Sequence, residues 1–220
     1  MPSRDYYEHV WEGVPAGVEP SDARLRGSFL LEHVLAERER GELRGRDAPM
    51  RVLDVGCGEG YFAELLHGSG VEVVAVDIAR EALRRARSRH AELDARLVDP
   101  DAPLPLEDSS FDVVWVGETI EHVHDTAAFL SEMRRVLRSG GMLLLSTPDH
   151  GPLSMLWLAL RPNRFTRHFD PRSDHLRFYT RRAFADLLDD FGFEDVVVRG
   201  AGGLPGARRV LLAAARRRRF

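Results

Sequence analysis

The sequence predicts an α/β fold in which helices cover both faces of a doubly wound, mainly parallel sheet of seven strands. Short apolar segments alternate with segments of helical periodicity from residue 51 onward, and this order is typical of such a sheet. The segment 111–116 is almost continuously apolar, as expected of a strand buried on both faces. The last two apolar segments, 193–199 and 209–214, have no helix between them. We therefore expect an antiparallel hairpin there, which makes the last strand antiparallel.

The N-terminal part of the chain is predicted to consist of an arm and one helix, at residues 1–49. Residues 1–27 are polar and contain three prolines, which favours an extended arm. Apolar residues at helical spacing predict a helix over 28–40, followed by a loop at 41–49. Residues 50–220 then form one domain, because 220 residues are too few for two domains of ordinary size.

The remaining elements follow from apolar periodicity and from capping residues. Strands are predicted at 51–55, 71–76, 96–98, 111–116 and 142–146, and helices at 61–67, 80–91, 126–137 and 180–191. Ser139, Gly140 and Gly141 are expected to end the helix at 126–137. Thr180 is expected to cap the last helix, with Gly192 as its stop.

Composition narrows the class of protein. The net charge is -4, so there is no overall electrostatic case for a nucleic-acid partner, and nucleic acid is not expected. The single cysteine, Cys57, cannot form an internal disulfide. We see no signal peptide and no apolar run of the roughly 20 residues that span a bilayer, so a cytoplasmic protein is expected.

The turn after the first strand indicates a ligand site. Glycines at positions 56, 58 and 60 allow a sharp turn and a close approach of the backbone to a ligand. Cys57 fills a small-residue position in this turn. Asp77 ends the second strand, where a carboxylate can accept both hydroxyls of a ribose. Together these residues predict an adenosine-binding crevice at the carboxyl ends of parallel strands.

The glycine spacing indicates which kind of adenosine ligand binds in this crevice. Dinucleotide folds use G-x-G-x-x-G, whereas this turn is G-x-G-x-G and is preceded by Asp54. A carboxylate there would repel a pyrophosphate but suits a cationic ligand. The segment 54–60, Asp-Val-Gly-Cys-Gly-Glu-Gly, resembles motif I of the Rossmann-like class I S-adenosylmethionine-dependent methyltransferases.

This resemblance implies further cofactor contacts. Asp77 matches the family's ribose-binding acid, and Asp99 matches an acid that bonds the adenine amino group, with Asp101 as a rival. Arg24 or Arg26 is a candidate for the methionine carboxylate, as in some relatives. The full set of expected cofactor residues is Asp54, Gly56, Cys57, Gly58, Gly60, Asp77, Ile78, Asp99, Val116 and Gly117.

A second group of polar residues follows the strand at 111–116. Glu118, Glu121 and His122 lie within five positions, and paired carboxylates repel each other unless protonated or bridged by a cation. The pattern is similar to ubiquinone-biosynthesis O-methyltransferases, where it holds Mg²⁺, and to methyltransferases of small-RNA 3′ ends, where a downstream histidine joins it. His175 is the candidate for that histidine. Without a metal, His122 is a general base or lines the pocket, with Glu118 beside it.

The segment after the strand at 142–146 is predicted to be an insertion, at about 150–175. Residues 153–160 are apolar almost all round, and basic residues follow up to position 168. This apolar face can be buried as a lid over the acceptor pocket, against a partner subunit, or in a lipid interface. We favour the lid, although the similar ubiquinone enzymes touch the membrane with an insertion at this place. Such a lid implies an acceptor with a hydrophobic part.

The sequence therefore predicts an enzyme that methylates a hydroxyl of a small-molecule or lipid-linked acceptor. A metal-dependent methyltransferase of RNA 3′-terminal 2′-hydroxyls is the alternative, because residues 161–182 are locally basic. A non-catalytic cofactor-binding subunit is the third reading, since binding residues do not prove turnover.

Overall fold

The structure is a computed structural model, which describes residues 4–43, 48–170, 173–205 and 207–219. Its strands are β1 (Arg51–Val55), β2 (Glu72–Asp77), β3 (Asp94–Leu97), β4 (Phe111–Gly117), β5 (Leu137–Pro148), β6 (Phe193–Ala201) and β7 (Val210–Arg217). Its helices are α1 (Arg4–Gly13), α2 (Ala23–Leu43), α3 (Tyr61–His67), α4 (Arg80–Arg89), the 3₁₀ helix η1 (Ile120–His122), α5 (Thr126–Val136), α6 (Pro152–Ala159), α7 (Pro162–His168) and α8 (Arg181–Asp190).

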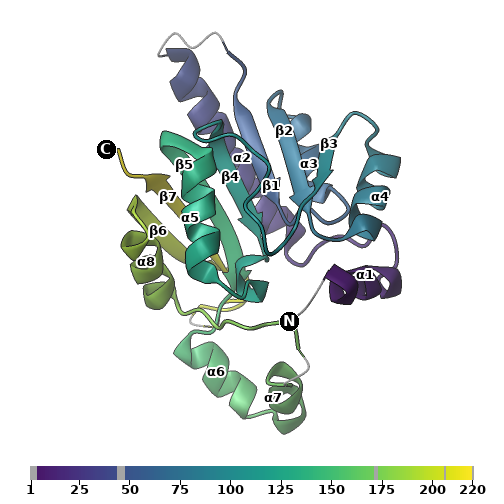
Figure 1. The fold of residues 1–220 in the computed structure, drawn as a ribbon. Helices are drawn as coiled ribbons and strands as arrows, with labels where there is room; N and C mark the ends of the chain where they lie inside the picture. Colours follow the sequence, from purple (N-terminus) through teal and green to yellow (C-terminus); the bar gives the residue numbers. More distant parts are fainter. Residues whose placement is uncertain (1–3, 44–47, 171–172, 206, 220) are drawn as a thin grey trace.

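The strands form one seven-stranded sheet in the order β3-β2-β1-β4-β5-β7-β6 (Figure 1). Neighbouring strands from β1 to β5 pair in parallel, and β7 pairs antiparallel with both β5 and β6. The predicted fold class, with its antiparallel last strand, is confirmed. The ends of β1, β2, β3 and β4 lie in register, so the loops that follow them meet at one edge of the sheet.

Apolar side chains pack on both faces of the sheet. Helices α2, α3 and α4 cover one face through Phe29, Leu30, Phe62, Leu66 and Leu83. Helices α5 and α8 cover the other through Leu130, Met133, Phe184 and Leu188. Each buried side chain of this size contributes roughly 1.5–3 kcal/mol to stability. This two-sided core fixes the sheet edge that carries the polar loops.

The N-terminal arm differs from the sequence-based expectation. Residues 4–13 form helix α1 rather than an extended segment, and α2 begins at Ala23. A polar composition favoured an extended arm, but polar contacts hold this helix in place. The Arg85 guanidinium donates hydrogen bonds to the carbonyls of Trp11 (2.7 Å) and Val14 (2.8 Å) at its C-terminal end. Pro15 lies beyond the end of α1 and so does not interrupt it. Part of the predicted loop, residues 44–47, lies outside the described residues.

The end of helix α5 also corrects a prediction. The helix ends at Val136, and residues 139–141 lie inside β5 instead of capping the helix. Leu137 is fully buried and pairs with Phe111, which begins the strand early. The register then shifts, and Gly140 takes a left-handed φ of 73° in that irregular part. The prediction for Thr180 is confirmed, because its side chain accepts a hydrogen bond from the Ala183 amide at the start of α8.

The predicted insertion contains the two short helices α6 and α7, which lie at the same end of the molecule as α1 (Figure 1). Neither helix has a buried residue. Among the described residues, no helix is both long and apolar enough to cross a membrane.

Candidate active site

The glycine turn after β1 has a left-handed backbone geometry that favours glycine. Gly56, Gly58 and Gly60 all have left-handed φ angles, of 72°, 55° and 83°. A Cβ atom on Gly56 would lie 2.3 Å from the Thr119 hydroxyl oxygen, and one on Gly58 would lie 2.9 Å from the Trp11 ring. The amides of Gly56 and Cys57 both donate to the Val76 carbonyl, so the turn is fixed to the end of β2.

Asp77 joins this turn to the second strand. Its carboxylate accepts hydrogen bonds from the amides of Gly58 (2.9 Å) and Ala79 (2.8 Å). Burial raises the pKa of Asp77, while these amides act in the opposite direction. A carboxylate has about four acceptor positions, so two remain for the hydroxyls of a ribose.

Asp54 is a buried carboxylate that lacks a full set of partners. It is 1% exposed, and its Oδ2 atom accepts no hydrogen bond. Burial, and then the nearby charge of Asp77, raise the pKa of Asp54 to about 7. A cationic ligand beside Asp54 would restore the ionised form and satisfy the bare oxygen. Asp54 and Asp77 therefore fit a ligand that has both a ribose and a positive charge.

The two arginine candidates for the methionine carboxylate are placed differently. Arg24 is exposed, whereas Arg26 is 3% exposed and donates to the Ser146 hydroxyl at 2.9 Å. Its guanidinium carbon lies 4.7 Å from the centre of the Phe62 ring. A Cβ atom on Gly117 would lie 2.6 Å from this guanidinium. Only Arg26 of the pair therefore reaches the site.

Other predicted cofactor residues have different environments. The Cys57 thiol is buried and its pKa is raised, mainly by burial, which suits a packing role and not a nucleophile. Val116 is fully buried in the core beneath the site, and Ile78 is half-buried. Asp99 and Asp101 are both exposed, and the Asp101 amide donates to the Asp99 carboxylate at 3.0 Å. That contact favours Asp99 as the carboxylate fixed at the end of β3.

A cavity of about 510 Å³ opens beside the crevice, beyond the end of β4. It is lined by Ser21, Asp22, Arg26, Glu118, Glu121, His122, Pro148, Asp174, His175, Arg209 and Val210. Nine of these eleven residues have polar or charged side chains. The four carboxylates, Asp22, Glu118, Glu121 and Asp174, outnumber the two guanidinium groups, Arg26 and Arg209.

Two glutamates at this cavity are under electrostatic and conformational strain. Glu118 has a left-handed φ of 52°, which costs a residue other than glycine on the order of 1–3 kcal/mol and is typical of functional sites. Glu121 is fully buried, with Thr147 bonded to one carboxylate oxygen and no partner on the other. Burial, and then the charge of Glu118, raise the pKa of Glu121 to about 8.

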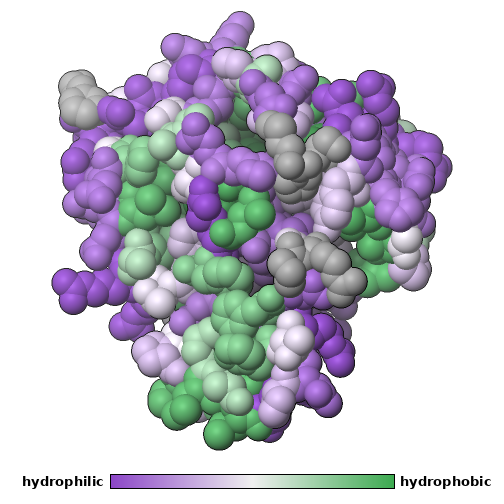
Figure 2. All heavy atoms as spheres, turned by 60° about the horizontal axis from the view of Figure 1, so that its bottom comes forward, coloured by the Kyte–Doolittle hydropathy of each residue, from purple (hydrophilic) through white to green (hydrophobic). Residues whose placement is uncertain are grey.

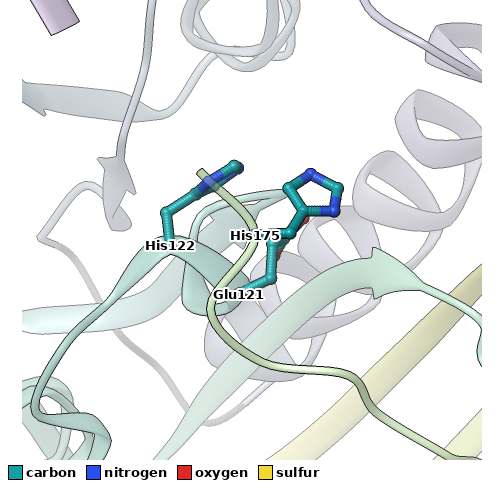
Figure 3. Close-up of side chains that lie close together, drawn as sticks. All are labelled: Glu121, His122 and His175. Atoms are coloured by element: carbon teal, nitrogen blue, oxygen red, sulfur yellow. The ribbon is translucent and has the colours of Figure 1, made fainter. Parts of the chain in front are cut away.

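Glu121, His122 and His175 lie together, and their potential ligand atoms are all within 4.8 Å of one another (Figure 3). The amides of Leu176 and Arg177 donate to the Glu121 carbonyl, which fixes the segment of His175 against η1. Glu118 lines the same cavity but stands outside this compact group. One carboxylate and two imidazoles fit a divalent transition ion better than the predicted Mg²⁺, which prefers oxygen ligands.

The sequence did not indicate four residues of this region: Tyr7, Asp22, Asp174 and Arg209. Asp22 and Arg209 form an ion pair across 187 positions of sequence. Asp174 lies 3.3 Å from the Nδ1 atom of His122. Tyr7 contacts the His122 ring from α1. Such long-range pairs leave no spacing pattern in a sequence, although Asp174 precedes the predicted His175 directly.

Comparisons with known proteins agree with this geometry. Residues 28–198 match a family described as "Methyltransferase domain". The chain belongs to this methyltransferase family. A probable S-adenosylmethionine-dependent methyltransferase of Mycobacterium tuberculosis is 39% identical over 176 residues, which are 78% of this chain and 57% of that protein. The ubiquinone biosynthesis O-methyltransferase of Psychrobacter arcticus is 32% identical over 174 residues, which are 76% of this chain and 67% of that protein.

The methyltransferase family also has the same fold. A crystal structure of an S-adenosylmethionine-dependent methyltransferase from Mesorhizobium loti superposes with a TM-score of 0.63 at 21% identity, over 77% of this chain and 92% of that one. The predicted resemblance to S-adenosylmethionine-dependent methyltransferases is confirmed. The chain spans just over half the length of its mycobacterial relative.

Proposed function

We propose that this methyltransferase transfers a methyl group from S-adenosylmethionine to a hydroxyl of an amphiphilic small-molecule or lipid-linked acceptor. The observation that carries this proposal is the arrangement of two unlike surfaces. The polar cavity contains His122 and the glutamates, and the exposed apolar helix α6 follows Pro148 at the cavity wall. An acceptor with a polar head and an apolar tail would fit both surfaces.

The roles of the cofactor residues follow from their contacts. The glycine turn would admit the cofactor close to the backbone, Asp77 would accept its ribose hydroxyls, and Asp54 would face its cationic end. The sulfonium of the bound donor makes its methyl group electrophilic. The protein then mainly aligns the acceptor oxygen for in-line attack. In a site without a metal, His122 would remove the hydroxyl proton as that oxygen attacks.

A metal is the second means of activating the hydroxyl, and it is an alternative to the base, because the one free lone pair of the His122 imidazole cannot both bind an ion and accept a proton. A divalent ion held by Glu121, His122 and His175 would lower the pKa of the acceptor hydroxyl and hold it in place. The bare Glu121 oxygen and the adjoining imidazoles support this ion. In the metal-free alternative, His122 acts alone and Glu118 is an electrostatic neighbour.

Two competing functions have less support. An RNA-end methyltransferase needs a basic groove, but carboxylates outnumber guanidinium groups in the cavity. A non-catalytic subunit has no need of the strained Glu118 or of an imidazole facing a cavity beside the cofactor. The names of two relatives, the ubiquinone biosynthesis enzyme and a malonyl-[acyl-carrier protein] enzyme of Pseudescherichia vulneris, are those of O-methyltransferases.

The function can be tested by methyl transfer from labelled S-adenosylmethionine to phenols, sugars, lipid extracts and RNA. We expect label in a hydroxyl-bearing small molecule or lipid and none in RNA. Chelation with EDTA should lower this activity by at least about tenfold, and Mn²⁺ should restore it more fully than Mg²⁺. Label in RNA alone would contradict the acceptor class, and full activity after chelation would contradict the metal.

We further propose that the α6–α7 surface, residues 152–168, rests on an anionic lipid surface while the acceptor is bound. Leu156, Trp157 and Leu160 are 58%, 48% and 73% exposed. Figure 2 shows an apolar area at this end of the molecule. The same segment carries three positive charges and no acidic residue; the charges are those of Arg161, Arg164 and Arg167. Exposed apolar groups beside arginines are typical of an interfacial helix.

Binding to lipid can be measured by flotation with vesicles of phosphatidylglycerol and of phosphatidylcholine. We expect binding to the anionic vesicles and a loss of at least about fivefold for the double variant Leu156→Glu/Leu160→Glu. Val197→Glu is the matched control, because Val197 is 61% exposed on β6. The lipid contact would be contradicted if both variants bound the vesicles equally, or if the unmodified chain did not bind them. The apolar surface would then be a lid or a subunit contact.

A further inference from the structure

Helix α1 lies outside residues 28–198, the part that matches the methyltransferase family, yet it adjoins the cofactor crevice. Figure 1 shows it beside α4 at the end of the sheet. The Arg4 guanidinium donates to the carbonyls of Ile78 (3.2 Å) and Val98 (3.1 Å), at the ends of β2 and β3. The Glu8 carboxylate accepts from the first two amides of α4. These contacts fix which side of α1 faces the crevice.

The inner side of α1 is aromatic. Tyr7 and Trp11 are four positions apart and therefore lie on one face of the helix. The Trp11 ring packs over the glycine turn, within 2.9 Å of where a Cβ atom on Gly58 would lie. Tyr6 stands on a different side and is 36% exposed. Of the two neighbouring tyrosines, Tyr7 is the one directed into the site.

Tyr7 lies beside the proposed base, on the same face of α1 as the Trp11 ring that packs over the glycine turn. Its ring contacts the His122 ring edge-on, with 6.2 Å between the centroids. Burial raises the pKa of Tyr7, and the charges of Asp174, Glu121 and Asp77 contribute to this shift. Its hydroxyl oxygen is buried and has no hydrogen-bond partner in the described part of the chain. This hydroxyl is open to a hydrogen bond with a ligand or a water, and no contact of the hydroxyl within the described residues fixes the ring against another part of the chain.

The donor's sulfonium must occupy the same region. It is bonded to the ribose that Asp77 would hold, and its methyl group must point toward the oxygen that His122 would deprotonate. We propose that Tyr7 recognises this sulfonium, with the electron-rich face of its ring against the positive charge, an inference that rests on the proposed function. Aromatic rings attract cations in this way, most strongly where water is excluded.

This contact has a consequence for turnover. The spent product, S-adenosylhomocysteine, has a neutral thioether in place of the sulfonium and loses the attraction. Tyr7 would therefore favour the donor over the product, which helps the product to leave. The contact adds a preference that the glycine turn and Asp77 do not supply, since both ligands share the same ribose.

The test is calorimetry of S-adenosylmethionine and S-adenosylhomocysteine binding to the full chain. In Tyr7→Leu, we expect the Kd for S-adenosylmethionine to rise roughly 5–30-fold and that for S-adenosylhomocysteine less than about threefold. Tyr7→Phe keeps the ring and should keep the preference for the donor. Tyr6→Leu is the matched control on the same helix and should leave both constants within about twofold.

Three outcomes would separate the possibilities. A parallel loss of both ligands in Tyr7→Leu would show a general loosening of α1 and would overturn the inference. Unchanged affinities for both ligands in Tyr7→Leu would overturn it as well, while the proposed function would stand. If the unmodified chain bound neither ligand, the proposed function itself would fail first.

Discussion

Replacing His122 with alanine is expected to lower methyl transfer by about 10²–10⁴-fold, the usual contribution of a positioned general base. The Nδ1 atom of His122 lies 3.1 Å from the Asp174 carbonyl oxygen. A carbonyl only accepts hydrogen bonds, so Nδ1 carries the proton and Nε2 has the free lone pair. In a site without a metal, that atom is the base for an acceptor in the cavity. Cofactor affinity should stay within about threefold, because His122 holds no cofactor group.

The matched control is His124→Ala, two residues along the chain. The His124 side chain is exposed, and its hydrogen bond to Arg177 uses only the backbone carbonyl. We expect that variant to keep its activity. Added imidazole should restore part of the activity of His122→Ala if the lost group is a base. Undiminished transfer by His122→Ala would remove both the base role and the metal role.

The fold and the cofactor crevice were predictable because their determinants are local. The apolar alternation of β1 and β2 is a property of a few consecutive residues. The glycine turn and Asp54 lie within seven positions, and Asp77 is tied to the turn by the end of the next strand. Residues at the ends of adjacent parallel strands must meet, whatever the rest of the chain does.

The remaining site residues were not predictable, for physical reasons. Asp22 and Arg209 meet only because β7 returns antiparallel to β5 and carries Arg209 back to the cavity. Helix α1 lies in a polar segment that contains prolines and has no buried residue, and side-chain hydrogen bonds to distant parts of the chain hold it in place. His175 is an intermediate case. The sequence shows a histidine that could bind a metal, but its approach to η1 depends on two hydrogen bonds that neighbouring backbone amides donate to the Glu121 carbonyl.

Gly58→Arg is expected to abolish measurable cofactor binding, with a rise in Kd of at least about 100-fold, or about 2.7 kcal/mol. The Gly58 amide donates to Asp77, so the backbone at this position is the floor of the ribose site. A side chain there has no free space on the crevice side, because even its Cβ atom would meet Trp11. An arginine would also place a positive charge where a cationic ligand must bind.

The same variant should remain folded, and this separates a loss of site from a loss of structure. A left-handed φ costs a non-glycine residue roughly 1–2 kcal/mol, well below the 5–15 kcal/mol of a typical domain. Gly70→Arg is the control, since Gly70 has a similar φ of 78° but lies before β2, at the opposite edge of the sheet. It carries the same backbone cost and should bind S-adenosylmethionine normally. Calorimetry that finds unchanged affinity in folded Gly58→Arg would place the donor elsewhere, because no ligand seated on that turn can share it with an arginine side chain.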